Sequence, residues 1–565
     1  MKIINVRIHN YRSIINESFN LDGYNLLVGA NNSGKSTVVN AILTFYEKIK
    51  YNVKTDFPKV GSDDNEAWIE ITYQLNDEEF NELPDGYKSE DRKIIIRKLL
   101  FSEDKNRFSV NQSNLYAVIN GELEENLFFG AKNVGKAKLG EVIYIPAVSN
   151  VADNLKMTGP SPLRDTINYL FKEVVQEHSS YKNLTTSFSE FNKFANEENG
   201  VFNSIVNPLN KGIEEWDISF KLQINPISPE EITKNLISYH FNDGNLSDEE
   251  VNINQYGHGF QRAIIFNLIK LSASLKKEKK VPKKEFNPKL VILLFEEPEA
   301  FLHPTQQEQL FYNLKTLAKE QEYQVLLTSH SSLFIGKATE KINQIIRINK
   351  IKGCSKLYQP TQEALNDFFD YAMTFKQILD GTLDEDDDKE LVIQEEQFRY
   401  QLWLDSERSS MFFANHVIIT EGATEKVLID YLLDNKWADL KKYKLYVLDS
   451  MGKYNVHRYM KLLCLFGIKH SVFIDSDSNT KKQKSLEKHK KIHEHINNCC
   501  NEYTVNEPYL IDPDIEGFLN LPMPRKDRKP LDMIIALTSN KVSDDKIKEL
   551  KSIFIDLIND KTGKL

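Results

Sequence analysis

Four acidic side chains follow apolar, strand-like runs in the last quarter of the chain. Glu421 ends one run, and Glu425 lies four residues later, where a helical turn brings it back to the same side. Asp475 and Asp477 end a second run two residues apart, so both side chains share one face of an extended strand. Carboxylate oxygens are ligands for Mg²⁺ or Mn²⁺ rather than for zinc. This spacing predicts a divalent-metal site.

A second chemical motif lies near the N-terminus. Residues 29–37 read GANNSGKST and fit the pattern GxxxxGK[S/T], directly after an apolar strand and before a predicted helix. In this context backbone N–H groups surround phosphates, Lys35 reaches the terminal phosphates and Ser36 ligates Mg²⁺. The residues predicted to hold a nucleotide here are Asn31, Asn32, Gly34, Lys35, Ser36 and Thr37.

A third motif pairs two carboxylates at the end of the apolar run 290–295. Glu296 is predicted to hold the Mg²⁺ shell, and Glu297 to orient or deprotonate the attacking water. A buried parallel strand delivers such a pair to the sheet edge where ligands bind. Glu296 occupies the first position of the pair, where aspartate is more usual. Its carboxylate is one methylene further from the backbone than that of an aspartate.

Two weaker signals complete a nucleotide site. Gly257 and Gly259 precede a long apolar helix predicted from residue 263 to about 271, and the start of this helix suits phosphate contact. His330 ends another apolar strand and is positioned to reach a γ-phosphate. Either signal alone is also compatible with an ordinary structural role.

The order of these four elements resembles that of ABC/SMC-type ATPase heads over residues 1–350, with FEEPEAFLHP at 295–304 similar to their Walker B and D-loop segments. The resemblance implies that two heads sandwich two ATP molecules, each with one Mg²⁺. It also implies that the contact from the segment at 257–259 is made across a dimer.

The C-terminal acids resemble the Toprim pattern, in which an acid in a strand-end EG turn is followed by DxD. With the further segment DPDIEG at 512–517 and an ABC head in front, essentially the whole chain resembles the OLD (overcoming lysogenisation defect) family of nucleases. That family implies a two-metal endonuclease that acts in bacterial antiphage defence.

The resemblance also implies roles for individual residues. Glu421, Asp475 and Asp477 would bind one metal, and Glu425, Asp514 and Glu516 would help to hold a second. Lys529 would neutralise charge on the phosphorane oxygens. Arg528 and Lys526 are alternatives to Lys529, and a solvent-facing basic loop is a further reading of this segment.

The elements that must position these residues follow from the wider pattern. The chain has 565 residues, 41% hydrophobic and 27% charged, which predicts several α/β domains rather than one core. We expect an ABC/SMC-type P-loop head with a helical dimerisation insertion, followed by a parallel-sheet Toprim domain. The predicted ranges are the head at 1–158 and 241–375, the insertion at 159–240, a linker at 376–411 and the Toprim domain at 412–565.

Composition restricts the environment of the protein. No apolar run approaches the roughly 20 residues of a membrane-spanning helix, and the opening segment lacks the apolar core of a signal peptide. The four cysteines show no metal-ligand spacing. A cytoplasmic location is expected. The net charge of −10 does not exclude a nucleic acid, because phosphate contacts need only a local basic stripe.

Two functions are compatible with these patterns. The first is a DNA endonuclease that uses Mg²⁺ or Mn²⁺ and is gated by ATP, with RNA as the alternative substrate. It is expected to act as a homodimer or homotetramer, through the heads and the insertion, with room for a defence partner protein or RNA. The second is a nucleotide-switched sensor or scaffold that binds without cutting. The chain after residue 520 is too short for the DNA-gate domain of a topoisomerase.

Overall fold

The computed structural model describes residues 1–130, 139–147, 155, 161, 163–164, 167–168, 178–195, 201–216, 218–222, 228–242, 250–251, 256–276, 288–368, 389–479, 483–522 and 528–559. It divides into two compact units. The first comprises 1–144, 286–299 and 304–565, and the second comprises 145–285 and 300–303. Each unit is described by itself.

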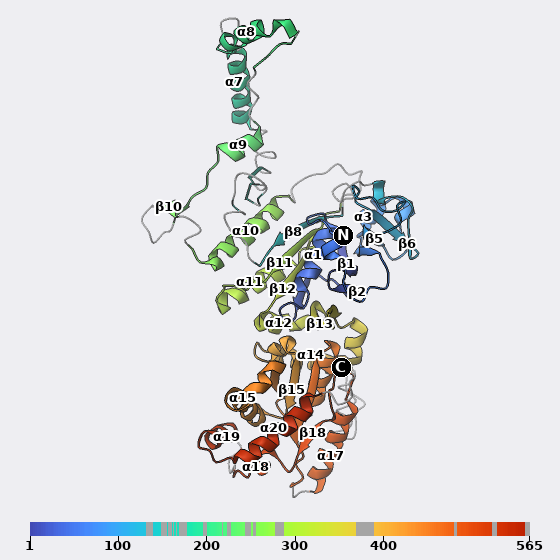
Figure 1. The fold of residues 1–565 in the computed structure, drawn as a ribbon, viewed down its shortest axis with the longest axis vertical. Helices are drawn as coiled ribbons and strands as arrows, with labels where there is room; N and C mark the ends of the chain where they lie inside the picture. The colour runs from blue at the N-terminus through green and yellow to red at the C-terminus, as the bar shows by residue number, and fades with distance from the viewer. Residues whose placement is uncertain are drawn as a thin grey trace. The chain divides into compact units, whose positions relative to one another are not determined.

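A twisted antiparallel sheet opens the first unit (Figure 1). Its strands alternate inward apolar and outward polar residues, so one face packs into the N-terminal core. In spatial order the strands are β2 (Ile14–Asn20), β1 (Lys2–Tyr11), β4 (Ala67–Gln74), β5 (Lys93–Phe101), β6 (Leu115–Ile119) and β7 (Glu122–Leu123). Short helices α2 (Val53–Asp56) and α3 (Asp77–Glu82) lie in its connections.

The second sheet carries the nucleotide motifs. Its central strands are parallel and almost fully buried, as expected for a sheet covered on both faces. In spatial order they are β14 (Cys354–Tyr358), β13 (Ile345–Ile351), β3 (Tyr24–Val28), β12 (Tyr323–Ser329), β11 (Val291–Glu296) and β8 (Glu141–Ile145). The covering helices are α1 (Lys35–Phe45), α11 (Pro304–Leu317) and α12 (Ser332–Ala338).

The opening of the chain differs from its expected form. The alternating pattern favours one hairpin-like run that ends at residues 25–28, but β3 leaves the β1–β2 hairpin and joins the parallel sheet between β12 and β13. All five residues of β3 are buried, which suits a central strand rather than a hairpin edge.

A third sheet of four parallel strands lies in the C-terminal part of the first unit. Helices α15, α19 and α20 pack their apolar residues on one face, and α16 and α17 follow around the rest of the sheet. The strands are β16 (Leu445–Asp449), β15 (His416–Thr420), β17 (Lys469–Asp475) and β18 (Tyr509–Ile511). The helices are α14 (Lys389–Trp403), α15 (Ala423–Asn435), α16 (Val456–Leu465), α17 (Gln483–Asn498), α18 (Ile515–Phe518), α19 (Lys529–Thr538) and α20 (Asp544–Ile558). The expected α/β class, a P-loop head followed by a parallel Toprim-like sheet, is confirmed.

The second unit holds the described part of the expected insertion at 159–240 together with described elements between 241 and 276, a range predicted to belong to the head. It contains α7 (Ser179–Ala195), α8 (Asn203–Gly212), α9 (Pro229–Asn235), α10 (His258–Lys276) and the short pair β9 (Phe241–Asn242) and β10 (Glu250–Val251). Its helical character agrees with the polar, helical pattern of this stretch. The basic run at 277–284 and the acidic run at 384–388 lie outside the described residues. None of the described helices is both long enough and apolar enough to cross a bilayer.

A single buried arginine joins the second and third sheets. Arg347 of β13 is 4% exposed and donates hydrogen bonds only to backbone carbonyls of the C-terminal part: Phe412 (3.1 Å), Ala414 (3.4 Å), Phe466 (3.0 Å) and Gly467 (3.1 Å). Burial lowers the pKa of Arg347 to about 10. A planar guanidinium with five donors suits this cluster of acceptors, which a lysine could not satisfy.

We expect Arg347→Met to lower the free energy of unfolding by about 3–5 kcal/mol, because it leaves a set of buried carbonyls without donors. Lys350→Met is the matched control, since Lys350 is an exposed residue of the same strand. Chemical denaturation of both variants measures the effect. Equal stability of the two would show that water replaces the lost donors.

A buried histidine makes the stability of the third sheet depend on pH. His470 of β17 must donate from Nδ1 to the carbonyl oxygen of Ile468 (2.9 Å), so its Nε2 accepts from the Thr504 hydroxyl (3.0 Å). Burial lowers the pKa of His470 to about 4.

Between pH 6.5 and 4 the folded protein therefore binds fewer protons than the unfolded chain, and the free energy of unfolding falls as the pH falls. We expect this one residue to account for a loss of about 2 kcal/mol between pH 7.5 and 5.0. Urea unfolding at the two pH values measures it. His470→Gln should reduce the difference by that amount, and an undiminished difference would exclude His470 as its source.

Candidate functional site

The phosphate-binding loop lies between β3 and α1, as the sequence motif predicts. Gly29 (φ 149°) and Gly34 (φ 116°) have left-handed backbone conformations that favour glycine. A Cβ on Gly29 would collide with the carbonyl oxygen of Ile348, and one on Gly34 with the Ser355 hydroxyl. Ser355 of β14 in turn donates to the carbonyl of Ser33 (2.7 Å) and so braces the loop.

The lysine of the loop is buried inside it. Lys35 is 7% exposed, and its Nζ donates to the carbonyl oxygens of Gly29 (2.8 Å) and Ala30 (3.1 Å). Burial lowers its pKa to about 8, against the opposing effects of Glu297, Glu299 and Glu296. The ammonium and the Walker B carboxylates therefore lie within electrostatic reach of one another.

The polar residues of the loop face outward. Asn31, Asn32 and Ser36 are exposed and Thr37 is half-buried, at the start of α1. Asn32 takes a positive φ of 63°, which turns the chain into the loop. A helix start beside a lysine is a favourable environment for phosphate groups, and nucleotide binding by these residues stays a prediction.

The paired carboxylates end β11 beside this loop. Glu296 is 8% exposed, and its Oε2 accepts a hydrogen bond from the Tyr144 hydroxyl (2.9 Å). The backbone of Glu297 turns into the left-handed region (φ 45°) and its N–H donates to the carbonyl of Thr328 (2.8 Å). Tyr144 had no sequence signal, because a tyrosine in an alternating strand is an ordinary residue.

His330 lies at the same edge of the sheet. Its Nε2 is 3.6 Å from Glu297 Oε1, and its backbone N–H donates to Glu299 Oε1 (2.7 Å). Burial and then Lys35 lower the pKa of His330, and Glu297 opposes them. Glu299, which also accepts from the Ser329 hydroxyl (2.7 Å), holds the histidine turn in place. Sequence reasoning assigned Glu299 no role.

The remaining nucleotide residues belong to the second unit. Gly257 precedes α10, and Gly259, which is buried, lies in its first turn. A helix begins here as predicted, although five residues earlier than residue 263. Contact of these glycines with a nucleotide stays a prediction.

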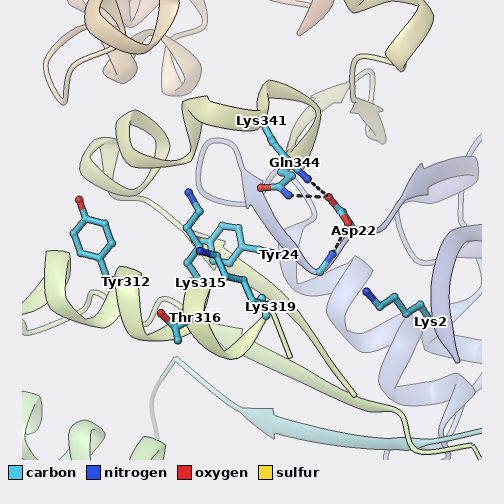
Figure 2. Close-up of a pocket in the computed structure, with 11 residues that line it drawn as sticks. Lys2, Asp22, Tyr24, Tyr312, Lys315, Thr316, Lys319, Lys341 and Gln344 are labelled. Atoms are coloured by element: carbon cyan, nitrogen blue, oxygen red, sulfur yellow. Dashed lines mark hydrogen bonds and ion pairs between the residues drawn. The ribbon is translucent and has the colours of Figure 1, made fainter. Parts of the chain in front are cut away.

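A separate cavity of about 470 Å³ lies at the opposite end of β3 from the phosphate loop. Figure 2 shows Asp22 at its wall, bound by Lys341 (3.1 Å) and Gln344 (3.0 Å). The other basic residues that line it are Lys2, Lys315 and Lys319. Its position, at the start of β3 rather than its end, separates it from the nucleotide motifs.

In the C-terminal sheet, the first pair of acids follows β15. Glu421 ends the strand, and Glu425 lies in the first turn of α15, 5% exposed. The N–H of Gly422 donates to Glu425 Oε2 (2.9 Å). Burial, with smaller contributions from the charges of Glu421 and Glu516, raises the pKa of Glu425 to about 7.

The second pair of acids follows β17, the strand next to β15. Asp475 is 8% exposed, and its Oδ1 accepts from the N–H of Ile515 (3.0 Å). Burial raises its pKa to about 9, and Glu425, Glu421, Glu516 and Asp477 add to the effect in that order. Such mutual repulsion places the predicted acids in one cluster.

A lysine lies among these acids. Lys453 is 3% exposed; its Nζ donates to the Asp475 carbonyl (2.7 Å), pairs with Asp477 and lies 3.3 Å from Glu421 Oε2. The sequence of the Gly452-Lys453 turn is compatible with an ordinary turn or with a contact to the DNA backbone, and in the structure its lysine points into the cluster. A buried cation here offsets the repulsion between the carboxylates.

The third group of acids lies around α18. Glu516 is 5% exposed, and Lys529 Nζ lies 2.8 Å from its Oε1. Asp514 caps α18, where it accepts from the N–H of Gly517 (2.7 Å) and from Asn479 (3.3 Å). Of the three basic candidates, Lys529 faces the acids, Arg528 pairs with Asp532 on its own helix, and Lys526 lies outside the described residues.

The donor set of this cluster fits a divalent cation. Buried atoms without a hydrogen bond of acceptable geometry include Glu421 Oε2 and both Oε atoms of Glu516, although lysine nitrogens lie near them. In the described part of the chain no three acid or histidine side chains already converge at coordination distance. Oxygen atoms that are buried and short of donors are nevertheless what a hard cation satisfies.

Comparison with known proteins gives two family matches. The family model described as AAA ATPase domain matches residues 1–126 and 78–335, and the one described as Overcoming lysogenization defect protein-like, TOPRIM domain, matches 412–477. The Old nuclease of Escherichia phage P2 is 25% identical over 491 residues, 84% of this chain and 77% of that protein. Endonuclease GajA of Bacillus cereus (strain HuB5-5) is 24% identical over 512 residues, which cover 78% of this chain and 68% of that protein. The SMC head domain from Thermotoga maritima is 11% identical, with a TM-score of 0.30 over 64% of this chain and all of that one.

Proposed function

We propose that this chain, which belongs to the AAA ATPase domain family and carries an OLD-like Toprim domain behind it, is an ATP-binding and divalent-metal-dependent DNA endonuclease. The observation that carries the proposal is the cluster of acids in which burial and neighbouring carboxylates raise the pKa values of Asp475 and Glu425; its members are Glu421, Glu425, Asp475, Asp477 and Glu516. The two named relatives, a nuclease and an endonuclease, support it.

In this proposal the nucleotide is held at the β3–α1 loop. Asn31, Asn32, Gly34 and Thr37 offer N–H and side-chain groups to the phosphates, and Lys35 turns from its loop carbonyls to the terminal phosphates. Ser36 and Glu296 hold the Mg²⁺ shell. Glu297 orients the attacking water, and His330, fixed by Glu299, contacts the γ-phosphate.

The nuclease site is assigned to the C-terminal cluster. Glu421, Asp475 and Asp477 hold one Mg²⁺ or Mn²⁺ ion, and Glu425, Asp514 and Glu516 help to hold a second. Bound divalent ions activate water and stabilise the leaving oxygen of a phosphodiester. Lys453 balances the carboxylate charge, and Lys529 is placed to neutralise charge on the phosphate.

We further propose a cytoplasmic antiphage effector that assembles as a homodimer or homotetramer. ABC-type heads form nucleotide sites across a dimer, and exposed apolar side chains on the described insertion helices support a second contact there. They are Phe191, Phe194, Ile205 and Leu209, each 47% to 59% exposed. DNA is the proposed substrate and RNA the alternative. A defence partner protein or RNA is also compatible with this assembly.

A plasmid-nicking assay on the purified chain tests this function, with Mg²⁺ or Mn²⁺ and with or without ATP. We expect relaxed or linear products that require the divalent ion and disappear with EDTA. A protein that binds ATP but cuts neither duplex DNA, single-stranded DNA nor RNA would instead be a nucleotide-switched scaffold. Comparing the reactions with and without ATP shows whether the nucleotide promotes or restrains cleavage.

A further inference from the structure

Two histidines of α17 face the acidic cluster. His489 and His493 are four residues apart, so they lie on the same side of the helix, one turn from each other. The helix is fixed by its buried residues Ile492 and Ile496. His489 Nδ1 lies 3.3 Å from Asp477 Oδ2, and the backbone of Asp475 contributes a hydrogen bond to His493.

The contact between His489 and Asp477 is not an ordinary hydrogen bond. His489 Nδ1 is buried and makes no hydrogen bond of acceptable geometry, and the same holds for His493 Nε2. Adjacent ligands of an octahedral ion at about 2.1 Å lie about 3 Å apart, close to the 3.3 Å between these two donors. The 3.3 Å between His489 Nδ1 and Asp477 Oδ2 is therefore compatible with two neighbouring ligands of one metal ion.

The same oxygen already attracts positive charge. Asp477 Oδ2 pairs with the Lys453 ammonium as well as facing His489, and Lys453 is almost completely buried. The neighbouring carboxylates of Glu421 and Asp475 repel that of Asp477, so cationic charge in addition to Lys453 is favourable at the point that both Asp477 and His489 face.

We propose that His489, with His493 one helical turn further on, supplies imidazole nitrogen to the metal centre and gives it a preference for Mn²⁺ over Mg²⁺. The proposal rests on the nuclease function above and specifies its metal. Mg²⁺ takes oxygen ligands almost exclusively, whereas affinity for nitrogen donors rises along the transition series. The spacing of four residues on one helical face is the one by which helices present paired histidines to a metal.

Metal binding by the full chain tests this inference without relying on cleavage. Calorimetric titration with Mn²⁺ and with Mg²⁺ alone, in the absence of nucleotide, gives the ratio of the two affinities. His489→Gln is expected to weaken Mn²⁺ binding at least about tenfold while Mg²⁺ binding changes less than about twofold. His493→Gln should shift the ratio in the same direction. Lys490→Gln, an exposed neighbour on the same helix, is the control and should leave the ratio unchanged.

A second substitution guards against a folding defect. His489→Asp replaces nitrogen with oxygen, so it should keep a bound ion but lose the preference for Mn²⁺. Suppose that Glu421→Gln abolishes metal binding but the ratio of Mn²⁺ to Mg²⁺ affinity is unchanged in His489→Gln and His493→Gln. That result would overturn this inference and leave the nuclease function standing. Binding of both metals that survives Glu421→Gln, or no binding by the wild type, would overturn the nuclease function as well.

Discussion

Glu421→Gln and Asp475→Asn are each expected to reduce phosphodiester cleavage by roughly a thousandfold, equivalent to about 4 kcal/mol of transition-state stabilisation. The Glu421 carboxylate lies 3.3 Å from Lys453 Nζ, the Asp475 carboxylate accepts from the N–H of Ile515, and an amide is a poor ligand for a divalent ion. ATP turnover should stay within about twofold of wild type, since the nucleotide motifs belong to another sheet. Nicking and phosphate-release assays on the same preparations measure the two activities.

The acid variants also carry a stability test that separates function from folding. Burial and neighbouring acids raise the pKa of Asp475 to about 9, which means that its charged form is disfavoured in the folded protein. A neutral asparagine relieves this repulsion, so Asp475→Asn should unfold no more easily than wild type at pH 8. Asp434→Asn, an exposed acid of α15, is the control for both assays. Loss of cleavage together with loss of stability would indicate a structural role instead.

Lys35→Ala is expected to lower ATP turnover by at least about a hundredfold, because Lys35 is the buried cation of the phosphate loop. Glu297→Gln should lower turnover similarly but retain ATP binding, since it changes the group that orients water. Lys50→Ala, an exposed lysine beyond α1, should have no effect. Fluorescent nucleotide binding and steady-state hydrolysis separate the two variants.

Separate sites for ATP hydrolysis and for DNA cleavage lead to a further expectation for the two ATPase variants. Neither should change divalent-metal affinity at the C-terminal cluster measured without nucleotide, because their residues lie around a different sheet. A loss of that affinity in Lys35→Ala or Glu297→Gln would contradict separate sites for hydrolysis and cleavage.

Much of the fold follows from local pattern, because apolar runs and glycine turns specify strands and their ends. The sequence favours strands at 66–75, 92–101 and 141–145, and the structure has them at Ala67–Gln74, Lys93–Phe101 and Glu141–Ile145. The acid pairs at 421–425 and 475–477 follow strands for the same reason. The pairing of β3 with β12 and β13 could not be predicted, because an alternating pattern indicates a strand but does not indicate which strands lie next to it.

What the sequence left open are contacts between residues far apart in the chain. The basic segment that contains the histidines of α17 is typical of a solvated helix or of a segment that follows phosphates, and only tertiary packing brings His489 to Asp477. Lys453 and Tyr144 likewise have side-chain types that occur anywhere, and their partners lie 24 and 152 residues away. Sequence spacing cannot report such pairs without their three-dimensional neighbours.

The arginine between the two sheets bears on how the molecule can be divided. Cleaving the chain before residue 412 would remove all four carbonyl partners of the Arg347 guanidinium and expose it to water in the remaining ATPase. The excised nuclease half would meanwhile expose Phe412 and Phe466, whose rings pack on each other beside that joint. Each fragment made at this boundary would lack part of the contact surface. Exchange of either half between proteins would therefore require compensating substitutions at that surface.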